Sequence, residues 1–266
     1  MQCGVSTACF YPQQTDASLS LLQTAGVQKV EIFLNTFSEL EDCFIDKLER
    51  MLTANNTEVL ALHPFTSGME TFFFASAYNG RMEDGLRIYR RYFEVCRRLH
   101  IPYLIFHGDY VATPFPFEQH CANVLQLANI AQEYGVILCQ ENVVRCKCGF
   151  PQYITQMRKQ TGDKLQFVLD LKQLRRAEIP VQEVLAAMRG KIAHLHLSDY
   201  DKTHDCLAPG KGLFDFSGLF QSLQQDGFRG SMVVELYRHN FADMSQLCSA
   251  VAHLDKIYSE VNTVKE

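Results

Sequence analysis

The sequence lacks any apolar run close to the ~20 residues that a membrane-spanning helix needs, so we expect no transmembrane segment. Glycine and proline are sparse, 15 and 8 among 266 residues, which excludes a collagen-like chain. The amino terminus has neither a basic segment nor a long apolar stretch, so no secretory signal is expected. A hydrophobic fraction of 47% excludes disorder. Together these features predict a soluble, cytoplasmic, globular protein.

Positive charge is not in excess either. The 25 lysines and arginines face 30 aspartates and glutamates, which gives a formal net charge of −5. This balance argues against a nucleic-acid partner held by bulk charge, although a local basic groove would be compatible with it.

Ten cysteines are present, but their positions do not indicate a disulfide framework. Seven lie in predicted strands or helices, where reduced thiols pack as small hydrophobic groups: Cys3, Cys9, Cys43, Cys96, Cys121, Cys139 and Cys248. Of the three in predicted loops, Cys146 and Cys148 form a C-x-C pair, which is shorter than the C-x2-C spacing of zinc sites. We therefore expect reduced cysteines in a cytoplasmic chain.

Short apolar runs alternate with amphipathic segments along the whole sequence. The predicted strands are 3–10, 30–34, 59–63, 103–107, 136–141, 167–171, 192–197 and 232–236. The predicted helices are 17–24, 40–52, 82–99, 118–133, 153–159, 181–188, 217–225 and 244–261. Glycines expected to end helices follow five of them: Gly26, Gly135, Gly162, Gly190 and Gly227.

Eight repeats in 266 residues give about 33 residues each, close to the length of a βα unit. Apolar strands such as Phe167-Val168-Leu169 indicate a parallel sheet covered on both faces. A doubly wound sheet would usually carry a glycine-rich phosphate loop after its first strand, but no Gly-x-Gly-x-x-Gly occurs. The sequence therefore predicts an α/β fold, a (β/α)8 TIM barrel formed as a single domain by residues 1–266.

Polar residues collect at the carboxyl ends of the predicted strands, where barrel enzymes place their catalytic groups. They are Glu31, His63, His107, Glu141, Asp170, His194, His196 and Glu235. Carboxylates that converge in one barrel mouth are costly to bury without a compensating cation. The mixture of oxygen and imidazole ligands suits Mn²⁺, Mg²⁺, Co²⁺ or Zn²⁺, and a purely structural polar network is the alternative. His194 and His196 share one strand face, so spacing does not choose between them.

Taken in order, these residues resemble the xylose isomerase-like barrel superfamily of sugar isomerases and epimerases, with its apurinic endonuclease relatives. The most specific matches are Gln140-Glu141-Asn142, Leu169-Asp170, the segment from His194 to Asp199, Pro209-Gly210-Lys211-Gly212, and Val234-Glu235. The resemblance implies one divalent cation held by Glu141, Asp170, His196 and Glu235. It also implies that Glu141 and Glu235 act as acid and base on a sugar, sugar acid or sugar phosphate, through an enediolate. Pure metal ligation by both glutamates is the alternative.

The same resemblance implies contacts with substrate. His63 and His107 would contact hydroxyl groups, or bond to the backbone as core histidines. Gln173 stands where relatives usually carry a histidine, so it can bind a hydroxyl but not a second metal strongly. Lys211, in a loop whose glycines would allow close approach to a ligand, could bind an acidic substrate group or remain a solvated charge. Lys172 would assist Lys211 or pair with Asp170.

Two further features complete the predicted site. Glu31 is expected to be structural or to orient a metal ligand. The aromatic run from Phe72 to Phe74 is expected to form a lid or an oligomer contact.

Three other functions compete with the isomerase. A metallo-phosphodiesterase of the apurinic endonuclease type would need a cluster of three zinc ions. The segment His204-Asp205-Cys206 departs from the endonuclease pattern, but His63, His107 and Cys206 leave a second zinc conceivable. A dehydratase of inosose-like polyols would use the same proton abstraction, and a barrel that only binds a sugar would use none. The expected partner is a small carbohydrate, with a homo-oligomer possible and no membrane.

Overall fold

The computed structural model describes residues 2–78 and 80–263. Eight parallel strands, each paired with the next in the chain, close into a barrel when β1 pairs with β8. The strands are β1 (Gly4–Ser6), β2 (Lys29–Phe33), β3 (Glu58–His63), β4 (Tyr103–Phe106), β5 (Ile137–Glu141), β6 (Gln166–Asp170), β7 (Ile192–Leu197) and β8 (Ser231–Val234). The predicted (β/α)8 barrel is confirmed.

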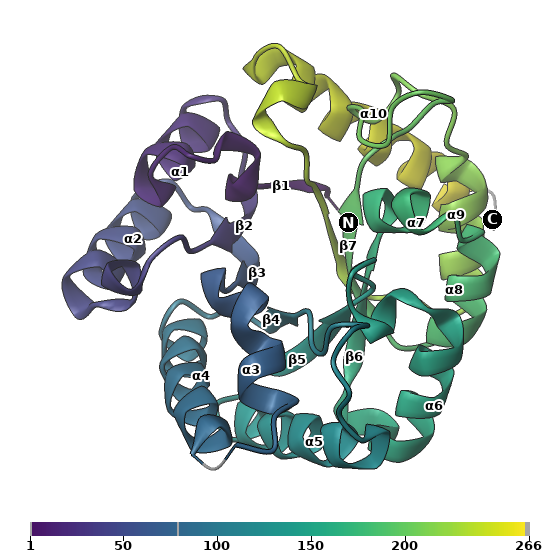
Figure 1. Ribbon diagram of the computed structural model, residues 1–266. Coiled ribbons are helices and arrows are strands. Elements are labelled where there is room, and N and C mark those ends of the chain that lie inside the picture. Colours follow the sequence, from purple (N-terminus) through teal and green to yellow (C-terminus); the bar gives the residue numbers. More distant parts are fainter. Residues whose placement is uncertain (1, 79, 264–266) are drawn as a thin grey trace.

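The described residues form ten α-helices. They are α1 (Thr15–Thr24), α2 (Asp42–Ala54), α3 (Glu70–Phe74), α4 (Arg81–Arg98), α5 (Phe117–Glu133), α6 (Pro151–Thr161), α7 (Leu171–Ala177), α8 (Val181–Met188), α9 (Phe216–Gln225) and α10 (Met244–Thr263). Figure 1 shows the helices arranged around the outside of the strands. No helix within the two described ranges has the length and apolar character needed to cross a membrane.

All eight predicted helices are present, but two helices were not predicted. One, α7, follows β6 without a loop because the Asp170 side chain caps it, accepting a hydrogen bond of 3.0 Å from the Gln173 backbone. The other, α3, lies in the segment expected to be a loop, and within it Phe72 is 52% exposed whereas Phe73 and Phe74 are buried.

The predicted strand over residues 3–10 is wrong beyond Ser6. The Ser6 hydroxyl accepts a hydrogen bond from the Ala8 backbone and begins a 3₁₀ turn over Thr7–Phe10. Cys3 therefore precedes the strand and Cys9 lies in the turn.

All ten cysteines are free and eight of them are buried. The five glycines predicted to end helices all have positive φ, although Gly162, with ψ of −134°, lies outside the left-handed helical region.

The inside of the barrel is filled by an apolar layer beneath a polar one. Small and medium side chains form the apolar layer: Ala61, Ile105, Cys139, Val168 and Ala193. Two residues after four of these side chains come His63, Glu141 and Asp170, which end their strands, and His107, which directly follows β4. Side chains two apart on a strand share a face, so the polar layer lies directly above the apolar one at the carboxyl end.

Candidate metal centre

His196 on β7 has one ring nitrogen held in place and the other free. Its Nε2 lies 2.9 Å from Oε2 of Glu31, whose other oxygen accepts a hydrogen bond of 2.9 Å from the Ser6 hydroxyl. Glu31 therefore fixes a proton on Nε2 and the orientation of the ring, as carboxylates behind metal-bound histidines do. The Nδ1 atom is left to face the mouth of the barrel.

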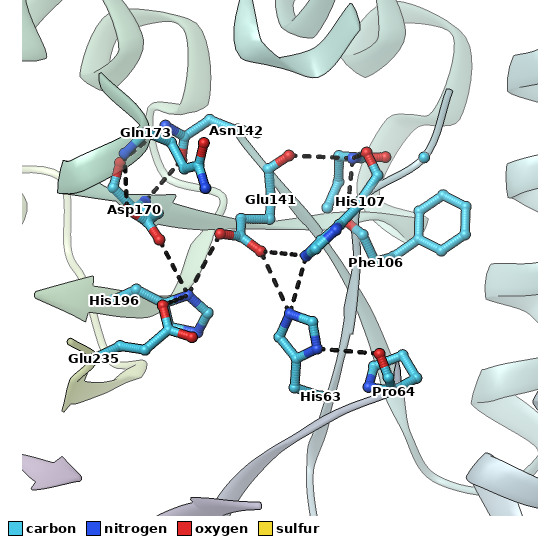
Figure 2. A network of polar contacts seen from close by, with 12 residues as sticks. His63, Pro64, Phe106, His107, Glu141, Asn142, Asp170, Gln173, His196 and Glu235 are labelled. Atoms are coloured by element: carbon cyan, nitrogen blue, oxygen red, sulfur yellow. Dashed lines mark hydrogen bonds and ion pairs between the residues drawn. The ribbon is translucent and has the colours of Figure 1, made fainter. Parts of the chain in front are cut away.

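Three carboxylates surround this Nδ1 atom. It lies 3.3 Å from Oε2 of Glu235, 3.5 Å from Oε1 of Glu141 and 3.6 Å from Oδ2 of Asp170. It is buried and has no hydrogen-bond partner among the described residues. Ligand atoms at about 2.0–2.2 Å from one ion lie about 3.0–3.5 Å from one another, so these separations suit a shared cation. Figure 2 shows Asp170, Glu141 and Glu235 converging on His196.

His194, the other candidate on β7, lies in a different environment. Its Nδ1 is 2.6 Å from the Ser231 hydroxyl and its Nε2 is 3.2 Å from Oε2 of Glu31. The ring of His194 therefore contacts Glu31 and Ser231, whereas the ring of His196 faces Glu141, Asp170 and Glu235. The geometry favours His196 as the ligand.

Backbone contacts hold Asp170 so that only one oxygen faces the mouth. Its Oδ1 caps α7, while its backbone N–H and C=O pair with the Asn142 side-chain amide at 2.7 and 3.0 Å. The role of Asn142 was missed by the sequence analysis, although it follows Glu141 directly. The side-chain oxygen of Gln173 accepts a hydrogen bond of 3.1 Å from the Val144 backbone, so only its NH₂ group remains for a substrate.

Lys172 lies inside this cluster. Its ammonium contacts Oδ2 of Asp170 and Oε2 of Glu235, and the residue is only 5% exposed. Burial alone would lower the pKa of Lys172, but Asp170 and Glu235 raise it well above its usual value, so the side chain is a cation. Of the two alternatives for Lys172, the structure shows the pairing with Asp170. The second partner, Glu235, is distant in sequence and was not predicted.

Burial raises the pKa of Asp170, whereas pairing between charges dominates for its neighbours His196 and Glu235. Burial would lower the pKa of His196, but Glu31 and Glu235 raise it well above its usual value. Burial likewise would raise the pKa of Glu235, yet Lys172 and His196 keep it below the usual range. In the metal-free protein, protons and Lys172 thus supply the positive charge that the carboxylates require.

A second group lies beside the first and shares Glu141. The Nε2 atom of His107 is 2.9 Å from both Nε2 of His63 and Oε2 of Glu141. Ligand atoms of His63, His107 and Glu141 all lie within 4.8 Å of one another, so these residues too could hold a metal ion. Burial lowers the pKa of His107, which keeps its ring neutral, as a ligand must be.

Cys206 does not belong to this second group. Among the described residues, the group contains His63, His107 and Glu141, whereas the buried Cys206 thiol interacts electrostatically with Lys172 and Asp170. The conceivable zinc site of His63, His107 and Cys206 is therefore not formed.

Glu70 positions His107 and was not anticipated. Its Oε2 accepts hydrogen bonds of 2.6 Å from the backbone N–H groups of His107 and Gly108, and its Oε1 accepts one from the Tyr89 hydroxyl. Burial raises the pKa of Glu70 well above its usual value. No sequence signal identified it, because the segment around it was expected to be a loop.

The loop that carries Lys211 is organised by an internal carboxylate. Oδ2 of Asp199 accepts hydrogen bonds of 3.0 and 2.9 Å from the backbone of Gly210 and Gly212. A Cβ atom on Gly212 would lie 2.4 Å from Oδ1 of Asp199. The glycine at 212 thus allows the close approach of Asp199, where the sequence analysis expected a ligand. Lys211 itself is exposed.

Comparisons with known proteins agree with this architecture. Residues 19–258 match the family model of the xylose isomerase-like TIM barrel. An inosose isomerase of Halalkalibacterium halodurans is 24% identical over 77% of this chain and 76% of its own. A D-tagatose 3-epimerase-like protein superposes over the full length of both chains with a TM-score of 0.83 and 17% identity. An IOLI protein crystallised with a bound zinc atom covers 100% of this chain and 99% of its own, with a TM-score of 0.75 and 18% identity.

Proposed function

The chain belongs to the xylose isomerase-like TIM barrel family, and from this premise we propose that it is a divalent-metal-dependent isomerase or epimerase. The substrate class is a sugar, a sugar acid or a sugar phosphate. The observation that carries the proposal is the buried, unpartnered Nδ1 atom of His196, which faces three carboxylate oxygens. The zinc atom of the similar IOLI structure and the names of the similar isomerase and epimerase support it.

The donor set fits one divalent cation. Glu141, Asp170, His196 and Glu235 would hold it through three oxygens and one nitrogen, a set suited to Mn²⁺, Co²⁺, Mg²⁺ or Zn²⁺. A cation held there would polarise the carbonyl group of a sugar.

Glu141 and Glu235 would move the proton. As a base, one carboxylate removes a proton from the carbon next to the carbonyl; the electrons of the broken C–H bond form a carbon–carbon double bond, and the π electrons of the carbonyl group move onto its oxygen to give an enediolate. For isomerisation, the carboxylic acid so formed returns the proton to the former carbonyl carbon, while the hydroxyl proton on the adjacent carbon passes to the enediolate oxygen, so that the carbonyl group moves to the adjacent carbon. For epimerisation, the other glutamate, after taking up a proton from solvent, donates it to the same carbon from the opposite face, and the enediolate oxygen becomes a carbonyl oxygen again. Lys172 and His196 keep the pKa of Glu235 below its usual value, and contacts with His107, His196 and His63 do the same for Glu141, so both carboxylates resist the burial that would neutralise them.

Proton exchange with solvent tests this proposal directly. The protein would be stripped of metal, loaded with Mn²⁺ and incubated in D₂O with ketoses, inososes, sugar acids and their phosphates. We expect NMR to show deuterium at the carbon next to the carbonyl of at least one substrate, and none with the metal-free protein. Loaded protein that exchanges no proton in any member of this panel would contradict the proposal.

The metal-loaded protein prepared for this experiment also distinguishes the isomerase from two alternative enzymes. A dehydratase would release water from an inosose and give a product of lower mass. A metallo-phosphodiesterase is the second alternative, because that class uses several metal ions and His63, His107 and Glu141 could hold another ion. Three zinc ions per chain together with cleavage of abasic DNA would replace the isomerase assignment.

An acidic substrate would be recognised by Lys211 rather than by Lys172, whose ammonium is already paired. We expect Lys211→Ala to raise the KM for a sugar acid or phosphate by roughly ten- to a hundredfold, the loss of one charge-assisted hydrogen bond. The KM for a neutral sugar serves as the control. Equal KM values for both kinds of substrate in wild type and variant would leave Lys211 as a surface charge.

Several sequence-based predictions accompany this function. We retain residues 1–266 as one domain, a carbohydrate as partner, a possible homo-oligomer and the cytoplasm as location. Eight buried free thiols are compatible with a reducing compartment. His63, His107 and Gln173 remain predicted contacts of substrate hydroxyl groups.

A further inference from the structure

Lys172 reaches the candidate metal centre from the first turn of α7. That helix starts directly after Asp170, so the lysine side chain can turn back and contact Oδ2 of Asp170, while its other partner, Oε2 of Glu235, follows β8. These are the same two oxygens that lie 3.6 and 3.3 Å from Nδ1 of His196. A metal ion and the ammonium would therefore draw on the same pair of oxygens.

The ammonium and a divalent ion cannot both be neighbours of these oxygens without strong repulsion, since both are cations in a buried site. Lys172 is only 5% exposed, and an ammonium so buried is stable only because the carboxylates pair with it. If the Lys172 ammonium were removed and no other cation took its place, less positive charge would remain to balance the carboxylates of Asp170, Glu235 and Glu141.

We propose that Lys172 is a built-in counter-ion that competes with the divalent cation for Asp170 and Glu235. It keeps the metal-free site assembled, makes metal binding weaker and more readily reversible, and is displaced when the ion binds. This inference rests on the metal centre of the proposed function.

Metal affinity measured by titration calorimetry tests the competition. We expect Lys172→Met to bind Mn²⁺ at least tenfold more tightly than wild type, because the competing cation is gone. Lys172→Arg keeps a cation and should remain within a few-fold of wild type. Lys202→Met is the matched control: it removes the same charge from an exposed position in the loop after β7 and should leave the affinity unchanged.

Thermal unfolding supplies a readout independent of affinity. The metal-free Lys172→Met protein should have a lower Tm than wild type, and saturating Mn²⁺ should raise its Tm by more than it raises that of wild type. Unchanged or weaker Mn²⁺ binding by Lys172→Met, with wild type binding normally, would overturn the inference and leave the proposed function standing. Absence of Mn²⁺ and Zn²⁺ binding in both proteins would instead remove the metal centre itself.

A crystal structure of the zinc-loaded wild-type protein keeps the inference testable if Lys172→Met does not fold. We expect the Lys172 ammonium to lie more than about 4 Å, the limit of an ion pair, from both Asp170 and Glu235. A zinc ion bound by His196 while Lys172 keeps both contacts would overturn the inference.

Discussion

At the scale of single residues, Glu31 lies behind the centre and acts on it through His196. It receives hydrogen bonds from His196 at 2.9 Å and from Ser6 at 2.9 Å. We expect Glu31→Gln to weaken Mn²⁺ binding by about ten- to a hundredfold, the usual effect of losing a carboxylate behind a metal-bound histidine. Ser6→Ala is the control, since it removes a hydrogen bond to Glu31 but not the carboxylate. Equal losses in both variants would show a general packing effect.

The two proposed bases make a second prediction at this scale. Glu141→Gln and Glu235→Gln keep the shape of the side chain but remove its basicity, so turnover at saturating Mn²⁺ should fall at least ~10²-fold. Steady-state kinetics with the substrate found by proton exchange measure this, and metal content must be checked in each variant. If a variant retains bound metal and most of its turnover, the substituted glutamate is not the base.

At the scale of elements, the contact between α5 and α6 predicts a dependence of stability on pH. Nδ1 of His120 on α5 is 2.8 Å from the Tyr153 hydroxyl on α6, and its buried Nε2 has no hydrogen-bond partner in the part of the chain that the structure describes. Burial lowers the pKa of His120 from 6.5 to about 4. Between these two values the unfolded chain binds a proton that the folded chain excludes, so stability is full above pH 6.5 and falls as the pH drops toward 4.

The size of this effect follows from the two pKa values. From pH 7.5 to pH 5, wild type should lose about 2 kcal/mol of unfolding free energy more than His120→Gln, which cannot titrate. Urea denaturation at both pH values gives the comparison. If the two proteins lose the same stability over this interval, His120 does not couple folding to pH.

The elements also show where local sequence information was insufficient. Helix α7 has only seven residues and begins where a strand ends, so its periodicity is hidden by the apolar run of β6. Helix α3 has five residues, too few for a periodic pattern to emerge. Both bear on the site, because α7 carries Lys172 and α3 carries Glu70.

At the scale of the whole molecule, a bound cation should stabilise the barrel, because its ligands come from four different strand ends. Mn²⁺ at a hundredfold excess over its Kd should add about 2.7 kcal/mol to the unfolding free energy. For a chain of this length we expect a rise in Tm of about 5–10 °C, reversed by a chelator. Differential scanning calorimetry measures the shift. A Tm that does not respond to Mn²⁺ would contradict binding at a folded site.

The sequence by itself determined the barrel and the neighbourhood of its site. The alternation of eight apolar and eight amphipathic segments indicates a parallel sheet buried on both faces, and the absence of a Gly-x-Gly-x-x-Gly loop favoured a closed barrel over an open doubly wound sheet. The polar residues that end these strands must then meet in one mouth, whatever the details of packing. Glu141, Asp170 and Glu235 could be assigned to the site for this reason.

Only the tertiary structure decided how the members of that site are paired. His194 and His196 are equivalent by strand periodicity, and the choice depends on Glu31, which approaches from a strand more than 160 residues away and leaves only His196 with a free nitrogen facing the carboxylates. Lys172 likewise pairs with Glu235 across the chain, 63 residues away. Such pairings depend on the depth and direction of side chains from different strands, which a one-dimensional spacing does not contain.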